Sequence, residues 1–399
     1  MPEFDNSKEY GFVLEGGGAK GAYQIGVWRA ALECGVKIKG VSGVSVGALN
    51  GALMCMGDLD KAEELWRNIT YSQVMVVDDE KMDNMIKKNY GSLDIHGVVK
   101  TALEILVTGG VDVTPLKKLI EEHVDEEKIR NSPIEFVLGT FSITGMKEVE
   151  ITAKEAEEGY LKDFLLASAY FPLFKAMRLH GKRYVDGGML NNVPIDMLIE
   201  RGYENIVVVR IYGPGLNRPV RIPKNVNVIE ISPKADLGTF LEFDGKKSIK
   251  NMKIGYCDGL RCFRNLKGKR YYLDAKKSEE WYLERFLGLH PAVVMALLEY
   301  YRLDYTREEL YTRQLLERVC PMIAEELKLT KEWTYEELYL TILEVCAKTL
   351  RIARYKIYTI DELIYEIVKK YASREQAAEG NTFPIFVLLL LKIIVIEEK

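Results

Sequence analysis

Histidine is scarce in this chain of 399 residues, with only four occurrences, at His96, His123, His180 and His290. The six cysteines are scattered without C-x-x-C spacing, which argues against both a zinc ribbon and a disulfide framework. The sequence also contains no H-E-x-x-H motif and no EF-hand loop. We therefore expect an activity that needs neither a metal ion nor another cofactor.

Excess positive charge is missing as well. The net charge is -4 and no basic stripe occurs, which argues against nucleic acid as a partner. Residues 1–5 show neither a positive n-region nor an apolar h-region, so we expect no secretory signal and a cytoplasmic location.

No apolar run is long enough to cross a membrane. The longest, residues 383–396, would reach roughly 21 Å as a helix, short of the ~30 Å hydrocarbon core. We expect this tail to pack on the protein, because Lys392 interrupts it and no basic face flanks it. Insertion at a membrane surface, or a role as a cover over a lipid tunnel, remains the alternative.

The first half of the chain alternates strands and helices. A predicted strand, Tyr10–Glu15, runs into a glycine-rich loop and a helix, and a second strand, Val36–Val44, leads into helix Val46–Met56. This order predicts an α/β domain with a largely parallel sheet. Further strands are predicted at Ile134–Ile143, Glu148–Thr152, Ile206–Tyr212 and Val226–Ile231.

The second half has a different pattern. Past about residue 235, leucine, tyrosine, glutamate and lysine recur at helical spacing and β-branched runs almost disappear. We therefore predict an α/β domain over 1–235, a helical domain over 236–375 and an apolar tail segment over 376–399.

Residues 43–47 form a G-x-S-x-G pattern between the second strand and its helix. Ser45 stands at the turn, and glycines two residues to either side remove the Cβ atoms that would collide as strand and helix fold back. Ser42 lacks the second glycine, because Val44 occupies that position. The pattern favours Ser45 as an exposed nucleophile, with an ordinary strand-to-helix turn as the alternative.

The loop Gly16, Gly17 and Gly18 follows the first strand and opens a helix. Its G-x-G-x-x-G spacing also fits a dinucleotide site, but the second strand ends at Ser45 and not at the acidic residue that would bind ribose. Consecutive glycine amides at a helix N-terminus suit an oxyanion hole. Lys20 could add a positive charge for substrate binding.

The base for Ser45 is harder to find. None of the four histidines is convincingly placed, although His180 lies near Asp186 in the sequence. Asp186 follows a predicted strand end, and the glycines after it permit close backbone approach. A simple Asp-Gly turn is the alternative interpretation of this segment.

Four motifs in this order resemble the patatin-like phospholipases: residues 15–21, 43–47, 167–172 and 186–188. The resemblance implies a three-layer α/β/α fold and a Ser-Asp dyad. In it Ser45 is the nucleophile, Asp186 the general base, and Gly16 to Gly18 the oxyanion hole. This chain carries Glu15 where the family frequently has aspartate, and Lys20 where it usually has arginine.

The function that we expect is a serine lipid acyl hydrolase of the phospholipase A type, with lipid or phospholipid as its substrate. It would touch the membrane surface transiently, as a peripheral protein. An esterase, thioesterase or acyltransferase could use the same dyad. A lipid-binding effector module with a silent dyad is the alternative from another class. The sequence does not indicate an oligomeric state.

Overall fold

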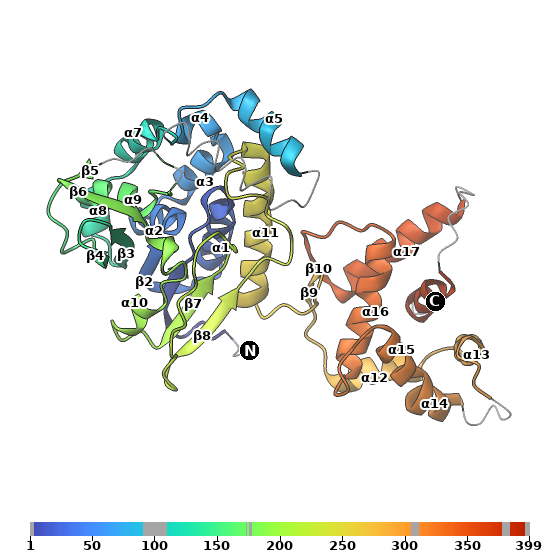
Figure 1. Ribbon diagram of the computed structural model, residues 1–399. Helices are drawn as coiled ribbons and strands as arrows, with labels where there is room; N and C mark the ends of the chain where they lie inside the picture. The colour runs from blue at the N-terminus through green and yellow to red at the C-terminus, as the bar shows by residue number, and fades with distance from the viewer. Residues whose placement is uncertain are drawn as a thin grey trace. The chain divides into compact units, whose positions relative to one another are not determined.

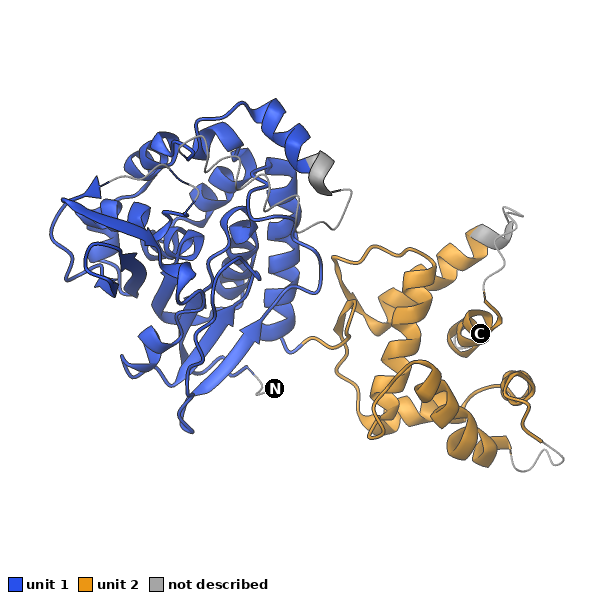
Figure 2. Cartoon of the chain, viewed as in Figure 1, with its two compact units in different colours: residues 1–265 blue, residues 266–399 orange. Residues whose placement is uncertain are grey.

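A computed structural model describes residues 4–90, 110–172, 174, 178–304, 311–376 and 384–395. The chain divides into two compact units, residues 1–265 and 266–399 (Figure 2). His96 and part of the segment that follows Pro172 lie outside the described residues.

The first unit extends about thirty residues beyond the boundary predicted at 235 because helix α11 (Gly245–Phe263) packs on helix α1 (Ala22–Glu33). The crossing is close. A Cβ atom on Gly26 of α1 would lie 1.9 Å from the Met252 carbonyl oxygen, and one on Gly255 of α11 would lie 2.0 Å from the Tyr23 carbonyl oxygen. Glycine on each helix thus allows the two backbones to touch.

The first unit is built on a mixed, mostly parallel sheet with the strand order β5-β6-β3-β2-β1-β7-β8, in which β4 also pairs with β3 (Figure 1). Strands β3, β2, β1, β7 and β8 run parallel, whereas β4 and β6 are antiparallel to β3. The strands are β1 (Glu9–Leu14), β2 (Lys37–Val44), β3 (Glu135–Ser142), β4 (Lys147–Thr152), β5 (Arg178–Leu179), β6 (Lys182–Asp186), β7 (Asn205–Val209) and β8 (Asn227–Ile231).

Helices cover both faces of this sheet. Consecutive residues of β2 point to opposite faces. Val41 faces α2, where a Cβ on Gly51 would lie 3.0 Å from it, and the Ser42 hydroxyl donates to the Pro194 carbonyl just before α10. The predicted α/β/α layering is thus confirmed. Besides α1 and α11, the helices are η1 (Gly18–Gly21), α2 (Val46–Met56), α3 (Leu59–Asn68), α4 (Tyr71–Val74), α5 (Asp79–Tyr90), α7 (Thr114–His123), α8 (Glu126–Arg130), α9 (Leu161–Ser168), η2 (Gly187–Met189) and α10 (Asp196–Ile199).

The second unit is mainly helical, as predicted, with one short parallel strand pair that the sequence did not suggest. Its elements are β9 (Tyr272–Asp274), α12 (Glu279–Leu287), α13 (Pro291–Tyr300), α14 (Tyr311–Gln314), the π-helix η4 (Leu315–Val319), α15 (Cys320–Glu326), α16 (Tyr335–Thr349), β10 (Ile357–Thr359), α17 (Ile360–Gln376) and α18 (Ile385–Val395).

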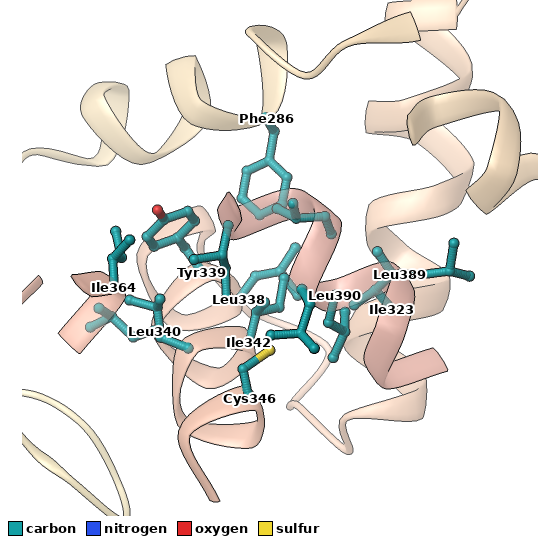
Figure 3. Close-up of a cluster of buried hydrophobic side chains, with 14 of the residues drawn as sticks. Phe286, Ile323, Leu338, Tyr339, Leu340, Ile342, Cys346, Ile364, Leu389 and Leu390 are labelled. Atoms are coloured by element: carbon teal, nitrogen blue, oxygen red, sulfur yellow. The ribbon is translucent and has the colours of Figure 1, made fainter. Parts of the chain in front are cut away.

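One apolar core holds this unit together (Figure 3). Phe286, Ile323, Ile342 and Leu390 meet in it from four different helices. Helix α18, which comprises most of the apolar tail, therefore lies on the core of its own unit. Within the described ranges, no helix combines the length and the hydrophobicity that a membrane crossing requires.

Candidate active site

Ser45 lies at a sharp turn between β2 and α2. Its backbone has φ 53° and ψ -132°, a conformation that non-glycine residues rarely adopt. A Cβ on Gly43 would lie 2.5 Å from the Gly47 carbonyl group, and one on Gly47 would lie 2.2 Å from the Leu14 carbonyl oxygen. The strand-to-helix elbow predicted from the glycine spacing is present. The Ser45 side chain is half-buried and does not cap α2.

Asp186 ends strand β6 and is 4% exposed. The Gly188 N–H donates a hydrogen bond to Asp186 Oδ1 at 2.8 Å, and hydrogen bonding by the Ser45 side chain acts to lower the pKa of the carboxyl. Burial raises the pKa of Asp186 from 3.8 to about 6, although both hydrogen bonds act to lower it. The structure thus brings together the serine and the carboxylate that the sequence suggested, and it places the carboxyl pKa near neutrality.

The glycine-rich loop lies beside Ser45, since a Cβ on Gly16 would be 3.2 Å from the Ser45 Cβ. The Gly16 N–H donates to the Asn192 carbonyl at 3.2 Å. For the Gly17 and Gly18 N–H groups, no acceptor is found in the described part of the chain. These two amides are therefore the ones that remain available to an oxyanion.

Lys20 lies at the edge of this loop and is half-buried. Its Nζ donates to the Tyr212 carbonyl at 2.7 Å. Burial lowers the pKa of Lys20, against the opposing effect of the nearby charges on Asp236 and Glu15. In this position the ammonium group ties the glycine-rich loop to the segment that follows β7.

The sequence did not single out the buried side chains that hold the loop. Glu15 is 1% exposed and accepts from the backbone N–H of Ile211 at 2.6 Å, from that of Tyr212 at 2.9 Å and from Arg210 Nε at 3.0 Å. Asn192 Nδ2 donates to Glu15 Oε1 at 3.3 Å and to the Gly16 carbonyl at 3.2 Å. The only local signal was the glutamate in place of the family's frequent aspartate.

The side chains of His180 and His290 are engaged away from Ser45 and Asp186. His180 Nε2 lies 2.7 Å from Asp163 Oδ2, and its ring stacks on Tyr160 with centroids 3.7 Å apart. His290 Nδ1 accepts from the Ala292 N–H at the start of α13. The proximity of His180 to Asp186 in the sequence therefore does not correspond to a catalytic pair. Among the described residues, no cluster of acidic, cysteine and histidine side chains could hold a metal ion.

The fold and this pair of side chains define a class, an α/β protein with a serine on a strand-to-helix elbow beside a buried carboxylate. Residues 12–199 match the family model described as patatin-like phospholipase. These residues, slightly less than half of the chain, thus form a patatin-like phospholipase domain.

Curated relatives match about half of the chain. Patatin-like phospholipase domain-containing protein 7 of Rattus norvegicus is 27% identical over 201 residues, which are 50% of this chain and 13% of that protein. Neuropathy target esterase sws of Drosophila persimilis is 32% identical over 184 residues, 46% of this chain and 11% of that protein. The chain thus spans a small fraction of the length of these relatives.

Among solved structures, VipD from Legionella pneumophila aligns over 98% of this chain and 92% of its own, with 15% identity and a TM-score of 0.40. ExoU, a type III effector protein, aligns over 96% and 78%, with 14% identity and a TM-score of 0.33. These scores are too low to transfer any property to this chain.

Proposed function

We propose that the chain hydrolyses acyl esters of phospholipids or related lipids through a Ser45–Asp186 dyad. The observation that carries the proposal is the pairing of Ser45, on its strand-to-helix elbow, with the buried Asp186 carboxyl, whose pKa the Ser45 side chain influences. A pKa of about 6 suits a general base at neutral pH. The patatin-like phospholipase domain supports a lipid substrate.

In the first half-reaction, Asp186 takes the proton from Ser45 Oγ, and Oγ attacks the ester carbonyl carbon. The negative charge that develops on the carbonyl oxygen is stabilised by the N–H groups of Gly17 and Gly18, which lie at the start of η1. The tetrahedral intermediate then expels the alcohol, which receives the proton held by Asp186. An acyl ester on Ser45 remains.

In the second half-reaction, Asp186 takes a proton from water as the water oxygen attacks the acyl ester. Collapse of the second tetrahedral intermediate releases the fatty acid, and the proton returns from Asp186 to Ser45 Oγ. Each step needs one carboxyl group that both accepts and returns a proton. A pKa near 6 permits both at neutral pH, because neither protonation state is strongly disfavoured.

A substrate in a bilayer implies transient contact with a membrane surface. Esterase, thioesterase and acyltransferase activities are alternatives, because they would use the same dyad with a different leaving group or acyl acceptor. A lipid-binding module without activity is the alternative from another class, and a covalent fluorophosphonate label on Ser45 separates it from all of these.

Phospholipid vesicles incubated with the wild-type chain should release fatty acid and lysophospholipid, measured by mass spectrometry. The Ser45→Ala chain should release neither. Equal release by both proteins would contradict the assignment of Ser45. Absence of release by the wild type, together with turnover of a thioester or acyl transfer to an added alcohol, would favour the corresponding alternative.

A further inference from the structure

The segment of residues 168–170, which begins at the last residue of α9, touches both members of the proposed dyad. Ser168 is 0% exposed, and its Oγ donates to the Gly139 carbonyl on β3 at 2.6 Å. The same Oγ accepts from the Ser45 N–H at 2.9 Å. Two residues further on, the Tyr170 carbonyl accepts from the Asp186 N–H at 2.9 Å.

The Ser168 hydroxyl lies where strands β2 and β3 separate. The last residues paired between them are Val44 and Gly139, and the chain leaves the sheet at Ser45. The hydroxyl bridges the gap, because it accepts from the N–H of Ser45 on one side and donates to the carbonyl of Gly139 on the other. It continues the ladder for one residue beyond the point at which direct pairing ends.

This bridge bears on the unusual backbone of Ser45. A non-glycine residue with φ 53° and ψ -132° is disfavoured and persists only where its surroundings fix it. The Ser45 N–H has its acceptor on Ser168, whose Cα belongs to a different element. Without that acceptor, a backbone donor at a crowded turn would lose its partner, and the peptide would be free to rotate.

The carboxylate is held against the same strand. Asp186 is paired with Thr140 of β3, the residue after Gly139, and its N–H is bound by the Tyr170 carbonyl. The Ser168–Tyr170 segment thus holds the backbones of Ser45 and Asp186 from one side, while β3 lies between the two strands that carry them.

We propose that the Ser168–Tyr170 segment is a clamp that sets the distance and angle between the Ser45 hydroxyl and the Asp186 carboxylate, with Ser168 as a positioning residue. This inference rests on the proposed function, because it concerns the geometry of the same dyad. Ser168 takes no part in the chemistry. It acts through the Ser45 backbone, so its loss should lower the rate of acylation and leave substrate binding nearly unchanged.

The chain offers a matched control. Ser42 is also 0% exposed, and its Oγ also donates to a backbone carbonyl, that of Pro194 at 2.9 Å. It lies on β2, three residues before Ser45. Ser42→Ala and Ser168→Ala each remove one buried hydroxyl and one donated hydrogen bond, so we expect similar losses in melting temperature. Only Ser168→Ala removes a contact to the Ser45 N–H.

The experiment measures kcat, KM and the rate of fluorophosphonate labelling of Ser45 for both variants, on a soluble ester, together with the melting temperature. We expect Ser168→Ala to lower kcat and the labelling rate by about 10- to 100-fold with KM nearly unchanged. Ser42→Ala should match the wild type in kcat, in KM and in the labelling rate. A Ser168→Ala protein with the kcat of Ser42→Ala would overturn the proposal.

The pH profile supplies a readout that a loss of stability would not move. The Ser45 hydrogen bond lowers the pKa of Asp186, so its weakening in Ser168→Ala should shift the acid limb of kcat/KM to higher pH. An unshifted limb would count against the clamp. If Ser168→Ala does not fold, Ser168→Cys keeps the side-chain shape with a weaker donor and acceptor. Its kcat should lie between the wild type and complete loss, and a wild-type kcat would overturn the proposal.

Failure of the clamp and failure of the dyad give different results. If Ser45→Ala is inactive and Ser168→Ala is fully active, the proposed function stands and the clamp does not. If Ser45→Ala keeps wild-type activity, the dyad itself is wrong and the clamp falls with it.

Discussion

The two units bury very different side chains. In the first unit, buried polar residues gather around the strand ends, including Glu15, Asn50, Ser168, Asp186 and Asn192, all at most 4% exposed. In the described part of the second unit, Glu344 is the one buried polar residue, and it accepts from the N–H groups of Arg270 and Tyr271 at 2.7 Å each.

This difference separates residues that stabilise the fold from residues that position the groups around Ser45. A buried polar group without a partner costs about 1–3 kcal/mol, so each one needs a specific set of contacts. The first unit meets that requirement repeatedly around Ser45, where donors and acceptors must be fixed. The second unit relies on apolar packing, which is stabilising but has little directional preference. Substitutions in the two units should therefore affect different measurements.

The largest effect on chemistry should come from Ser45→Ala. We expect kcat on lipid and on soluble esters to fall by about 10³-fold or more, because the nucleophile is lost. The melting temperature should stay close to that of the wild type, since the change removes one half-buried oxygen. Ser42→Ala is the control, with activity near the wild type. Loss of activity in Ser42→Ala with retention in Ser45→Ala would reverse the assignment.

The largest effect on stability should come from the second unit. Leu390 is 0% exposed on α18, whereas Ile385 on the same helix is 68% exposed. We expect Leu390→Ala to cost about 2–5 kcal/mol of unfolding free energy, and Ile385→Ala less than about 0.5 kcal/mol. Chemical denaturation measures both.

The same helix tests the role of the apolar tail. Removal of residues 381–399 should lower the melting temperature, and activities on vesicles and on a soluble ester should fall together, because α18 packs in its own core. An unchanged melting temperature with a selective loss of vesicle activity would show instead that the tail acts at the membrane.

A smaller effect is expected from Asp186→Asn on stability. Burial raises the pKa of Asp186 from 3.8 to about 6. Between these values the folded protein keeps a proton that the unfolded chain has released, so wild-type stability falls as pH rises through this window. In the Asp186→Asn variant the side chain at this position does not titrate. Its stability relative to the wild type should rise by on the order of 1–3 kcal/mol between about pH 4 and about pH 7. A difference that does not change with pH would contradict the buried carboxylate.

The smallest effect should come from His180→Ala. Its imidazole contacts Asp163 and Tyr160 and is about one-third exposed, so we expect kcat within about twofold of the wild type. A loss comparable to that of Ser45→Ala would point to a histidine base. Treatment with EDTA should likewise leave activity unchanged, and inhibition that calcium reverses would contradict the metal-free mechanism.

The elbow could be predicted from the sequence because its determinants are local. Gly43 and Gly47 each lie two residues from Ser45, and this spacing predicts the turn. Helix α2 then spans Val46–Met56, as predicted. The largely parallel sheet and the helices on its faces followed from the alternation of strands and helices, whereas the strand order was not predicted. The local sequence of Asp186, a strand end followed by glycines, fitted a simple turn as well as a catalytic carboxylate, and its place in an ordered set of motifs favoured the carboxylate.

The remaining features depend on contacts between distant parts of the chain. Gly26 packs closely on Met252, and Gly255 on Tyr23, so that α11 belongs to the first unit and the boundary lies after residue 265. Neither glycine has a distinctive local sequence pattern. Ser168 stood in a recognised motif, but its bond to the Ser45 N–H depends on how α9 lies against β3. Asn192 holds Gly16 across the sheet edge in the same way.

The dyad is tested most directly by the rate at which a fluorophosphonate labels Ser45, measured across pH in the wild type and in Asp186→Asn. The account predicts that the rate of wild-type labelling rises with pH and is half-maximal at about pH 6, where Asp186 loses its proton. In Asp186→Asn, labelling should be slower by about 10³-fold and should lack this titration. Labelling of Asp186→Asn at the wild-type rate, with the same dependence on pH, would contradict the role of Asp186.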